Sequence, residues 1–255
     1  MAPLRILLCR AACGTLLMAG STFAAKGQPA QPLLGVVELF TSQGCNSCPP
    51  ADAVLGSLAQ RGDIIALAFH IDYWDYLGWH DTMASPQFTA RQYAYRGALG
   101  TSNVYTPQAV LNGRMDANGA EGDTILDDLK AMRGEGKGLA VPVRLDESEA
   151  GKLKIDVGAG ERPSGPVSLV LVFFDPRTDV NIGRGENGGR TIAYFNAVRD
   201  VETIGMWDGK PLHVEMPDSM FAQKRAGGCA VLLQETPDGE PGPILGAALM
   251  TEKKD

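Results

Sequence analysis

Two cysteines separated by two residues are the part of this sequence best suited to chemistry. The CNSC tetrapeptide, Cys45 to Cys48, follows an apolar strand-like run at 35–41 and precedes a segment with helical periodicity at 49–60. A thiol at a helix N-terminus faces unsatisfied N–H groups and the positive end of the dipole, and both favour the nucleophilic thiolate. We therefore predict that Cys45 attacks and that Cys48, one turn in, resolves the mixed disulfide.

Two other uses of the cysteine pair stay open. A structural disulfide would close so short a loop that it adds little chain-entropy stabilisation, and a redox site is favoured over it. Two thiolates together with one or two histidines would suit copper or zinc. His70, at the end of the next apolar run, is the candidate ligand, and His80 lies ten residues further on. Metal binding without turnover, as in a copper chaperone, is therefore the non-enzyme alternative.

A Thr-Pro step downstream is the second chemical signal. Thr106 and Pro107 come immediately before a short apolar run at 109–111. An X-Pro bond can be cis, and a cis bond marks a specific tight turn. We predict that the Thr106–Pro107 bond is cis and that it lies beside Cys45 and Cys48.

Glu38 is a weaker candidate, seven residues before Cys45 in the presumed first strand. A buried glutamate beneath the disulfide could move protons during exchange. The alternative is a strand residue that points to solvent or pairs with a lysine.

Two further segments have both a functional and a structural interpretation. Aromatic residues crowd an acidic stretch at 72–81, which could anchor a substrate polypeptide or pack on its own domain; they are Tyr73, Trp74, Tyr76 and Trp79. The segment 183–188 matches GxGxxG by letter, but a strand-like run follows it where a dinucleotide site needs a helix. We interpret it as a hairpin turn, from which Glu186, Asn187 and Arg190 could face the redox cleft.

The elements that must position these residues alternate in type. Strand-like and helical segments between 35 and 133 follow the order β-α-β-α-β-β-α, and the Asn112-Gly113 pair predicts a hairpin. Strands that alternate with helices give an α/β layer structure. After a glycine-rich linker at 134–138 the composition changes to short strands separated by Gly/Pro turns, which predicts a β-sandwich.

The N-terminal segment predicts export. Residues 1–25 carry two arginines, a short apolar run and the sequence Thr22-Phe23-Ala24, which together resemble a signal peptide cleaved after Ala24. We therefore expect a periplasmic or secreted protein. Three cysteines remain after cleavage, so one close pair is accompanied by Cys229, which its apolar surroundings predict to be a buried thiol.

Composition narrows the possible partners. The chain has 255 residues, of which 44% are hydrophobic and 21% charged, and its formal net charge is -7. These values are typical of a globular protein and exclude collagen, low-complexity disorder and a coiled coil. The acidic balance argues against nucleic-acid binding, which needs a basic face.

The CxxC, the Thr-Pro and the element order together resemble the thioredoxin fold. Longer strings resemble a bacterial family of secreted proteins of unknown function; they are VELFTSQGCNSCPPAD, HIDYWDYLGWHD, FTARQYAY, VYTPQAVLNG, GENGGRTIAYFNAVRDV and GPILGAALM. The resemblance implies a thioredoxin-like domain at 35–133, with an insertion at about 71–100, followed by an all-β, β-sandwich-like domain at 139–251. Two features depart from ordinary thioredoxins: Gly44 replaces the tryptophan before the first cysteine, and Pro49 and Pro50 follow the second.

We therefore predict an exported thiol–disulfide oxidoreductase that acts on protein thiols or disulfides in the periplasm. Its site residues are Cys45, Cys48, Thr106, Pro107 and Glu38. The exchange needs no organic cofactor, and its direction depends on the reduction potential of the pair. After signal cleavage we expect neither nucleic acid nor a membrane as partner. The alternatives are a copper or zinc chaperone and a non-catalytic binding protein of the thioredoxin fold.

Overall fold

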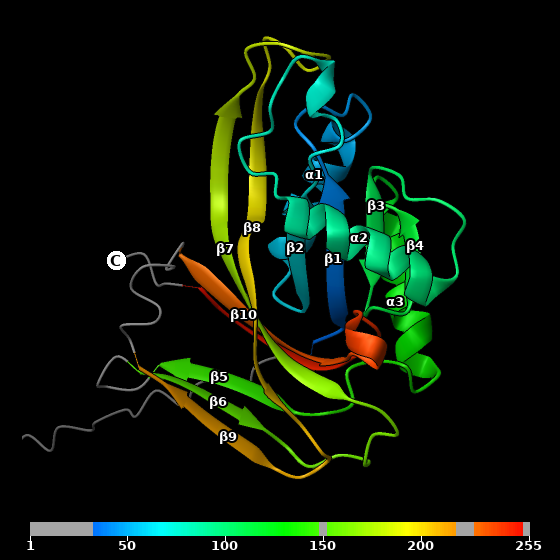
Figure 1. The fold of residues 1–255 in the computed structure, drawn as a ribbon, viewed down its shortest axis with the longest axis vertical. Coiled ribbons are helices and arrows are strands. Elements are labelled where there is room, and N and C mark those ends of the chain that lie inside the picture. The colour runs from blue at the N-terminus through cyan, green and yellow to red at the C-terminus, as the bar shows by residue number, and fades with distance from the viewer. Residues whose placement is uncertain (1–32, 148–151, 218–226, 252–255) are drawn as a thin grey trace, which may run out of the picture. The chain divides into compact units, whose positions relative to one another are not determined.

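The middle of the molecule is built from its two most apolar segments. A computed structural model of the chain describes residues 33–147, 152–217 and 227–251. Within it, β1 (Gly35–Thr41) and β2 (Ile64–His70) are buried along their whole length and pair in parallel (Figure 1). Strands covered on both faces are apolar throughout, which explains why neither segment shows a polar–apolar alternation.

The element order predicted for the first half of the chain is confirmed. The elements that follow or separate the two central strands are α1 (Pro49–Ala59), η1 (Asp75–Leu77), α2 (Pro86–Leu99), β3 (Gln108–Leu111), β4 (Met115–Asn118) and α3 (Gly122–Gly134). Helix α2 has an N-cap, because the Ser85 side chain accepts a hydrogen bond from the Gln87 N–H and Pro86 begins the helix. The short 3-10 helix η1 is the element that the sequence did not predict.

The second half of the described chain consists of strands and one short 3-10 helix. These elements are β5 (Val143–Glu147), β6 (Leu153–Val157), β7 (Val167–Asn181), β8 (Thr191–Met206), β9 (Leu212–Met216), β10 (Gly228–Glu235), η2 (Pro237–Gly239) and β11 (Ile244–Thr251). β7 is longer than the short strands that the sequence predicts, because it runs unbroken along β8 from Val167 to Asn181. Among the described residues, β8 is the only strand that pairs with β7 beyond Phe174, so Pro176 sits on an edge where no N–H is needed.

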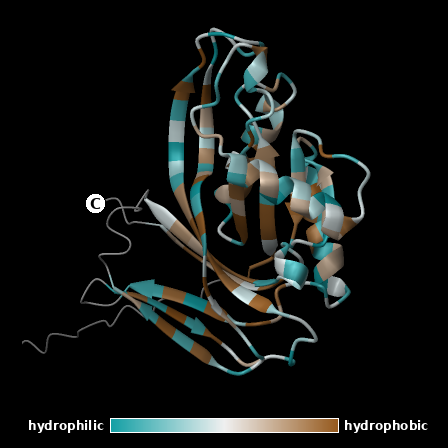
Figure 2. Cartoon of the chain, in the orientation of Figure 1, coloured by the Kyte–Doolittle hydropathy of each residue, from teal (hydrophilic) through white to brown (hydrophobic). Residues whose placement is uncertain are grey.

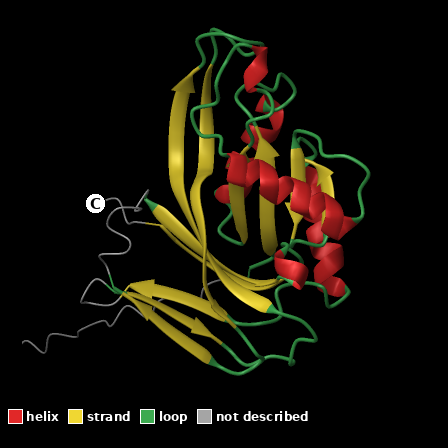
Figure 3. Cartoon of the chain, in the orientation of Figure 1, coloured by secondary structure: helices red, strands yellow, loops and turns green. Residues whose placement is uncertain are grey.

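Strands from both halves form one mixed sheet of eight, in the order β11-β10-β7-β8-β2-β1-β3-β4. The junction between the halves is a parallel contact at Ala68 and Ala197, to which the Asn196 side chain adds a hydrogen bond to the Ala66 carbonyl oxygen. A separate antiparallel sheet has the order β5-β6-β9. The chain is thus a mixed α/β protein with a large mixed sheet and few helices (Figure 3).

Among the described residues, three large apolar cores occupy the faces of these sheets, and Ile182, Ile192 and Tyr194 form a fourth, smaller one. The helices α1 and α3 pack on one face of β1, β2 and β3, and α2 packs on the opposite face, where residues of β7 and β10 join the same core. The small sheet shares the third core with the other face of β7 and β10. Hydrophobic and hydrophilic residues alternate along β5, β6 and β9, as expected for strands buried on one face (Figure 2).

Candidate active site

Cys45 and Cys48 form a disulfide at the start of α1, with their Cα atoms 5.4 Å apart. Cys48 is the N-cap residue, and its carbonyl oxygen accepts the N–H groups of Ala51 and Asp52. Pro49 and Pro50 occupy the first helical positions, so they remove two of the N–H groups that a helix N-terminus normally offers. Cys45 is only 2% exposed and Cys48 is fully buried.

The Thr106–Pro107 bond is cis and lies beside the disulfide, as predicted. The Thr106 hydroxyl donates to Cys45 Sγ at 3.3 Å and in turn accepts the Trp74 indole N–H at 2.7 Å. Ser47 Oγ lies 3.4 Å from Cys45 Sγ, and the Ser47 hydroxyl also reaches the Thr106 carbonyl oxygen. The hydroxyl groups of Thr106 and Ser47 thus lie next to the Cys45 sulfur, at the helix end where Pro49 and Pro50 have no backbone N–H to donate.

In the aromatic segment, Trp74 and Trp79 pack against the molecule itself, whereas Tyr76 is exposed. Trp74 packs so closely on the cysteine loop, residues 42–48, that a Cβ added at Gly44 would lie 3.2 Å from the Trp74 Cβ. This contact explains why glycine precedes the first cysteine. Trp79 donates its indole N–H to Gln43 Oε1 at 2.8 Å, whereas Tyr76 stacks on Trp74 and stays 77% exposed.

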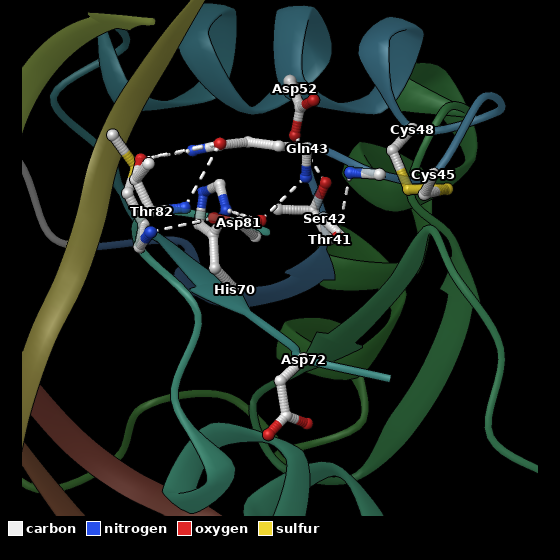
Figure 4. Close-up of polar contacts among 12 residues, drawn as sticks. Thr41, Ser42, Gln43, Cys45, Cys48, Asp52, His70, Asp72, Asp81 and Thr82 are labelled. Atoms are coloured by element: carbon white, nitrogen blue, oxygen red, sulfur yellow. Dashed lines mark hydrogen bonds and ion pairs between the residues drawn. A yellow bond between two sulfur atoms is a disulfide. The ribbon is translucent and has the colours of Figure 1, made fainter. Parts of the chain in front are cut away.

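A buried acid lies one helical turn after Cys48. Asp52 is 3% exposed, and its Oδ1 accepts the Thr41 hydroxyl at 2.7 Å (Figure 4). Burial raises the pKa of Asp52 to about 7, although the charge of His70 and the Thr41 hydrogen bond act in the opposite direction. Our sequence interpretation missed this residue. The spacing of four from Cys48, which places both side chains on one helix face, was the available signal.

A buried ion pair supports the same loop from β2. His70 Nδ1 lies 2.8 Å from Asp81 Oδ2, and both side chains are fully buried. The Asp81 carboxylate also accepts the N–H groups of Gln43 and Met83. Burial alone would lower the pKa of His70, but the Asp81 carboxylate raises it; burial likewise opposes the lowering of the Asp81 pKa by His70. Each member of the pair therefore favours the charged form of the other.

The turn between β7 and β8 reaches the cysteine loop and hydrogen-bonds to its backbone. The buried Asn187 side chain donates to the carbonyl oxygens of Gln43 at 3.0 Å and Cys45 at 2.8 Å. Its own Oδ1 accepts the Arg190 guanidinium at 2.9 Å. The hairpin turn inferred from the glycines is present, and Asn187 is the member of the segment that faces the cysteines, while Glu186 is exposed.

Comparison with known proteins places this chain in a family. The family model described as a protein of unknown function, DUF1223, matches residues 36–234. The chain belongs to the DUF1223 family. A structural-genomics target protein from Agrobacterium tumefaciens, whose crystal structure is known, has 44% sequence identity to this chain. The two structures match with a TM-score of 0.80 over 88% of this chain and 97% of that one.

A more distant structural relative shares the fold alone. HBP35 of Porphyromonas gingivalis is 14% identical to this DUF1223 chain, with a TM-score of 0.58 over 86% of this chain and 75% of that one. Among curated proteins, no significant match is found.

Glu38 lies on the opposite face of the sheet from the α1 helix of this DUF1223 protein. Strand alternation directs Glu38 to the side of Val36 and Phe40, whereas Thr41 faces α1. Glu38 is fully buried and accepts hydrogen bonds from Arg91 Nε, at 2.8 Å, and from the Tyr95 hydroxyl. It therefore neither points to solvent nor pairs with a lysine, and its contacts belong to α2 rather than to the disulfide.

His70 is the histidine that the metal alternative requires, but Asp81 occupies its Nδ1. Across residues 33–147, 152–217 and 227–251 of the DUF1223 chain, no group of three or more His, Cys, Asp or Glu side chains is arranged to hold a metal ion.

The remaining predictions concern Cys229 and the N-terminal segment of this DUF1223 chain. Cys229 is 5% exposed on β10, in the core that the small sheet shares, so its predicted burial is confirmed. The predicted signal peptide lies outside the described residues. In the described part of the chain, no helix is long and apolar enough to cross a membrane.

Proposed function

We propose that this DUF1223 protein is an exported thiol–disulfide oxidoreductase that uses Cys45 and Cys48 on polypeptide substrates. The observation that carries the proposal is the surroundings of Cys45. Its sulfur belongs to a CxxC disulfide at a helix start and accepts a hydrogen bond from Thr106, beside a cis peptide bond. Such a hydrogen bond stabilises a thiolate, and the thiolate is the species that attacks and leaves in exchange.

A thioredoxin-like arrangement of the first half, followed by an all-β part, supports this proposal. The parallel pair β1 and β2 flanks α1, and β3 and β4 continue the sheet antiparallel before α3. The CxxC lies between β1 and α1, and the cis bond immediately precedes β3. This is the order of elements that the sequence resemblance to the thioredoxin fold implies.

The exchange proceeds in two displacements at sulfur. When a protein dithiol is oxidised, its thiolate attacks Cys45 Sγ, the Cys45–Cys48 bond breaks, and Cys48 leaves as a thiolate that takes up a proton. The second substrate thiolate then attacks the substrate sulfur of the mixed disulfide, and Cys45 leaves. The substrate thus loses two electrons to the pair, and the reverse sequence reduces a substrate disulfide.

Access to Cys45 requires movement of its cover. Because Cys45 is 2% exposed, a polypeptide must displace part of the layer formed by Trp74, Thr106 and Ser47 before it reaches the sulfur. The exposed Tyr76 ring, stacked on Trp74, lies at the outside of this layer. Aromatic side chains in such positions commonly anchor binding partners, so substrate contact at Tyr76 is consistent with displacement of Trp74.

Trapping of the mixed disulfide tests the proposed function. In the full chain expressed in a bacterial periplasm, Cys48→Ser keeps the attacking thiol and removes the resolving one. We therefore expect Cys48→Ser to accumulate disulfide-linked partner proteins on a non-reducing gel, and Cys45→Ser to accumulate none. Cys229→Ser, which removes a buried thiol in a different core, is the control and should match the wild type.

Equal trapping by both cysteine variants would contradict the assignment of Cys45 as the attacking thiol. If neither variant traps a partner and the reduced wild-type protein binds copper stoichiometrically through both thiols, the metal-chaperone alternative replaces the proposed enzyme.

A further inference from the structure

Trp74 is joined by one hydrogen bond to the residue that contacts the Cys45 sulfur. Its indole N–H donates to Thr106 Oγ1 at 2.7 Å, and the Thr106 hydroxyl donates to Cys45 Sγ at 3.3 Å. An indole N–H, a hydroxyl and a sulfur therefore form a row that links three distant parts of the chain. Because neither the indole nor the hydroxyl is charged, a change of charge in this row can arise only at the sulfur.

The number of protons on Thr106 fixes the direction of the row. A threonine hydroxyl has one proton to donate and two lone pairs that accept, whereas an indole N–H can only donate. Trp74 therefore occupies an acceptor site of Thr106 and leaves its single proton for another group. In this structure that group is Cys45 Sγ.

Tyr73 is a second neighbour of the Thr106 hydroxyl, with which its own hydroxyl interacts. Tyr73 donates its proton to Gln92 Oε1 at 3.1 Å, so its oxygen is a competing acceptor for the Thr106 proton. Hydrogen bonds to charged acceptors are stronger than those to neutral ones. A Cys45 thiolate, which exists only when the disulfide is reduced, therefore holds the Thr106 proton more strongly than the disulfide sulfur or the Tyr73 oxygen does.

The strength of one bond in the row affects the other, because hydrogen bonds in a chain polarise one another. When Thr106 donates to a charged sulfur, its oxygen becomes a better acceptor for the Trp74 N–H. The indole should consequently be held more firmly over the reduced pair than over the disulfide. Coupling between two equilibria is reciprocal, so an indole that binds better to the reduced form must also stabilise that form.

The backbone around Trp74 fixes the start of the row. Trp74 is the N-cap residue of η1, and its carbonyl oxygen accepts the Leu77 N–H at 3.0 Å. A Cβ added at Gly44 would lie 3.2 Å from both the Cβ and the carbonyl oxygen of Trp74, so the cysteine loop and η1 are in close contact. The row thus begins outside the elements that carry the two cysteines.

We propose that the Trp74 indole is a redox-sensitive cover that acts through Thr106: it is held more tightly over the reduced pair and thereby biases Cys45 and Cys48 towards taking electrons from substrate dithiols. The inference rests on the proposed exchange function and adds its direction. Trp74 is a positioning residue, because it reaches the sulfur only through the Thr106 hydroxyl.

The equilibrium that Trp74 shifts is balanced in atoms and electrons. The Cys45–Cys48 disulfide and two glutathione thiols give two cysteine thiols and one glutathione disulfide, and two electrons pass to the protein. The Cys45 thiol then releases its proton to water and becomes the thiolate that accepts from Thr106. Stabilisation of this thiolate favours the reduced form and makes the pair a stronger oxidant.

The first test measures how firmly the indole is held in each redox state of the full-length protein. Exchange of the Trp74 indole hydrogen with deuterium is followed by NMR in the disulfide form and after reduction by dithiothreitol. We expect exchange to be slower in the reduced form by about twofold to fivefold, the gain that polarisation adds to one hydrogen bond. The internal control is the Trp79 indole N–H, bonded to Gln43 Oε1 at 2.8 Å, which should exchange equally in both forms.

The second test compares the glutathione equilibrium of the wild type, Trp74→Phe, Thr106→Val and the double variant. Trp74→Phe keeps an aromatic ring and removes the N–H, so the pair should become harder to reduce by about twofold to fivefold. Thr106→Val removes the donor to the sulfur and should have a larger effect, about tenfold. In the Thr106→Val background, Trp74→Phe should add nothing, because the two residues act in series. Trp79→Phe, the matched control, should leave the equilibrium unchanged.

Equal exchange of the Trp74 hydrogen in both redox forms, or the same change at Trp74 and Trp79, would overturn the proposal. A Trp74→Phe effect that is absent, or that persists in the Thr106→Val background as a mere loss of packing would, also overturns it. If Trp74→Phe does not fold, the exchange test decides, because it needs no substitution.

Failure of the proposed function gives a different result. A pair that reacts neither with glutathione nor with protein partners would overturn the exchange function itself. The hydrogen-exchange test would still confirm or reject the coupling between the indole and the sulfur, because dithiothreitol rather than a physiological partner reduces the disulfide there.

Discussion

At the scale of the residue, Asp52 combines two properties that oppose each other. Aspartate usually lies on the exposed face of a helix, yet the Asp52 side chain, four positions after Cys48, is 3% exposed. Its single hydrogen bond to Thr41 offsets only part of the cost of burying a carboxylate. The consequence is a pKa of about 7, raised by burial from an ordinary value of 3.8. A group of this kind exchanges protons at neutral pH, where an exposed aspartate does not.

Asp52 should make stability depend on pH, and Asp52→Asn should remove that dependence. The folded-state pKa lies above the unfolded value, so the folded state binds more protons, and this group's contribution becomes less favourable as pH rises from about 4 to about 7. The wild type should therefore lose stability relative to Asp52→Asn over that range, by at most about 1.4 kcal/mol per pH unit, with a constant difference above it.

Urea unfolding of both proteins between pH 4 and 9 measures this difference. Asp127→Asn alters an exposed carboxylate that pairs with Lys130, and it should show no comparable trend. A difference between wild type and Asp52→Asn that stays constant across the range would show that Asp52 titrates normally.

At the scale of the element, the turn between β7 and β8 holds the cysteine loop, residues 42–48, through hydrogen bonds to its backbone. Both strands extend beyond the part of the sheet that β10 joins, and they carry Asn187 to the backbone of Gln43 and Cys45. Ile182, Ile192 and Tyr194 form a small core at the base of this extension, with Trp79 packed against it. A distant hairpin thereby supplies donors to two carbonyl oxygens of the loop that precedes α1.

Asn187→Ala should destabilise the protein and loosen the loop. The substitution removes the side-chain donor to the Gln43 and Cys45 carbonyl oxygens. The Cys45 oxygen keeps the Cys48 N–H, whereas loss of the donor to the Gln43 oxygen should cost about 1–3 kcal/mol if water cannot reach it. Asn187→Asp should cost more, because a carboxylate would face both carbonyl oxygens. Urea unfolding gives the stability change, and the rate at which dithiothreitol reduces the Cys45–Cys48 disulfide reports loosening, which should raise it.

Asn118→Ala is the matched control for Asn187→Ala. The Asn118 side chain is exposed, and its hydrogen bonds in the described part of the chain are to Ala120 and Glu121. If Asn187→Ala has the same stability in urea and the same rate of reduction by dithiothreitol as the wild type, the hairpin does not hold the cysteine loop.

At the scale of the whole molecule, the two halves of the sequence complete each other's cores. The core on the α2 side joins residues of β1 and β2 to residues of β7, β8, β10 and β11. Gly56 of α1 lies so close to the Phe195 ring of β8 that an added Cβ would be 2.6 Å from it. Without the second half, β2 would become an apolar edge strand, and such edges promote aggregation.

A fragment that ends in the glycine-rich linker should therefore not fold as a monomer. We expect residues 25–138 to be insoluble or molten, whereas the chain from residue 25 to its end should unfold in a single cooperative transition. Circular dichroism and size-exclusion chromatography of the fragment, with urea unfolding of the longer chain, measure this. A soluble fragment with a native-like unfolding transition would show that the first half folds independently.

The sequence by itself determined the local features of this protein. The CxxC at a helix start, the cis Thr106–Pro107 bond beside it, the order of elements through α3 and the buried Cys229 all follow from neighbouring residues and their periodicity. These features depend on short-range steric rules and on the alternation of apolar residues, which a sequence displays directly.

The tertiary structure alone decided which polar groups meet. The sequence showed no link between His70 and Asp81, or between Asn187 and Cys45, because those pairs are joined only when the strands find their register and the long hairpin bends onto α1. Glu38 was expected near the disulfide and faces α2 instead, since its neighbour relations depend on which face of β1 each helix covers. Asp52 titrates near neutral pH for the same reason: burial is a property of the assembled core.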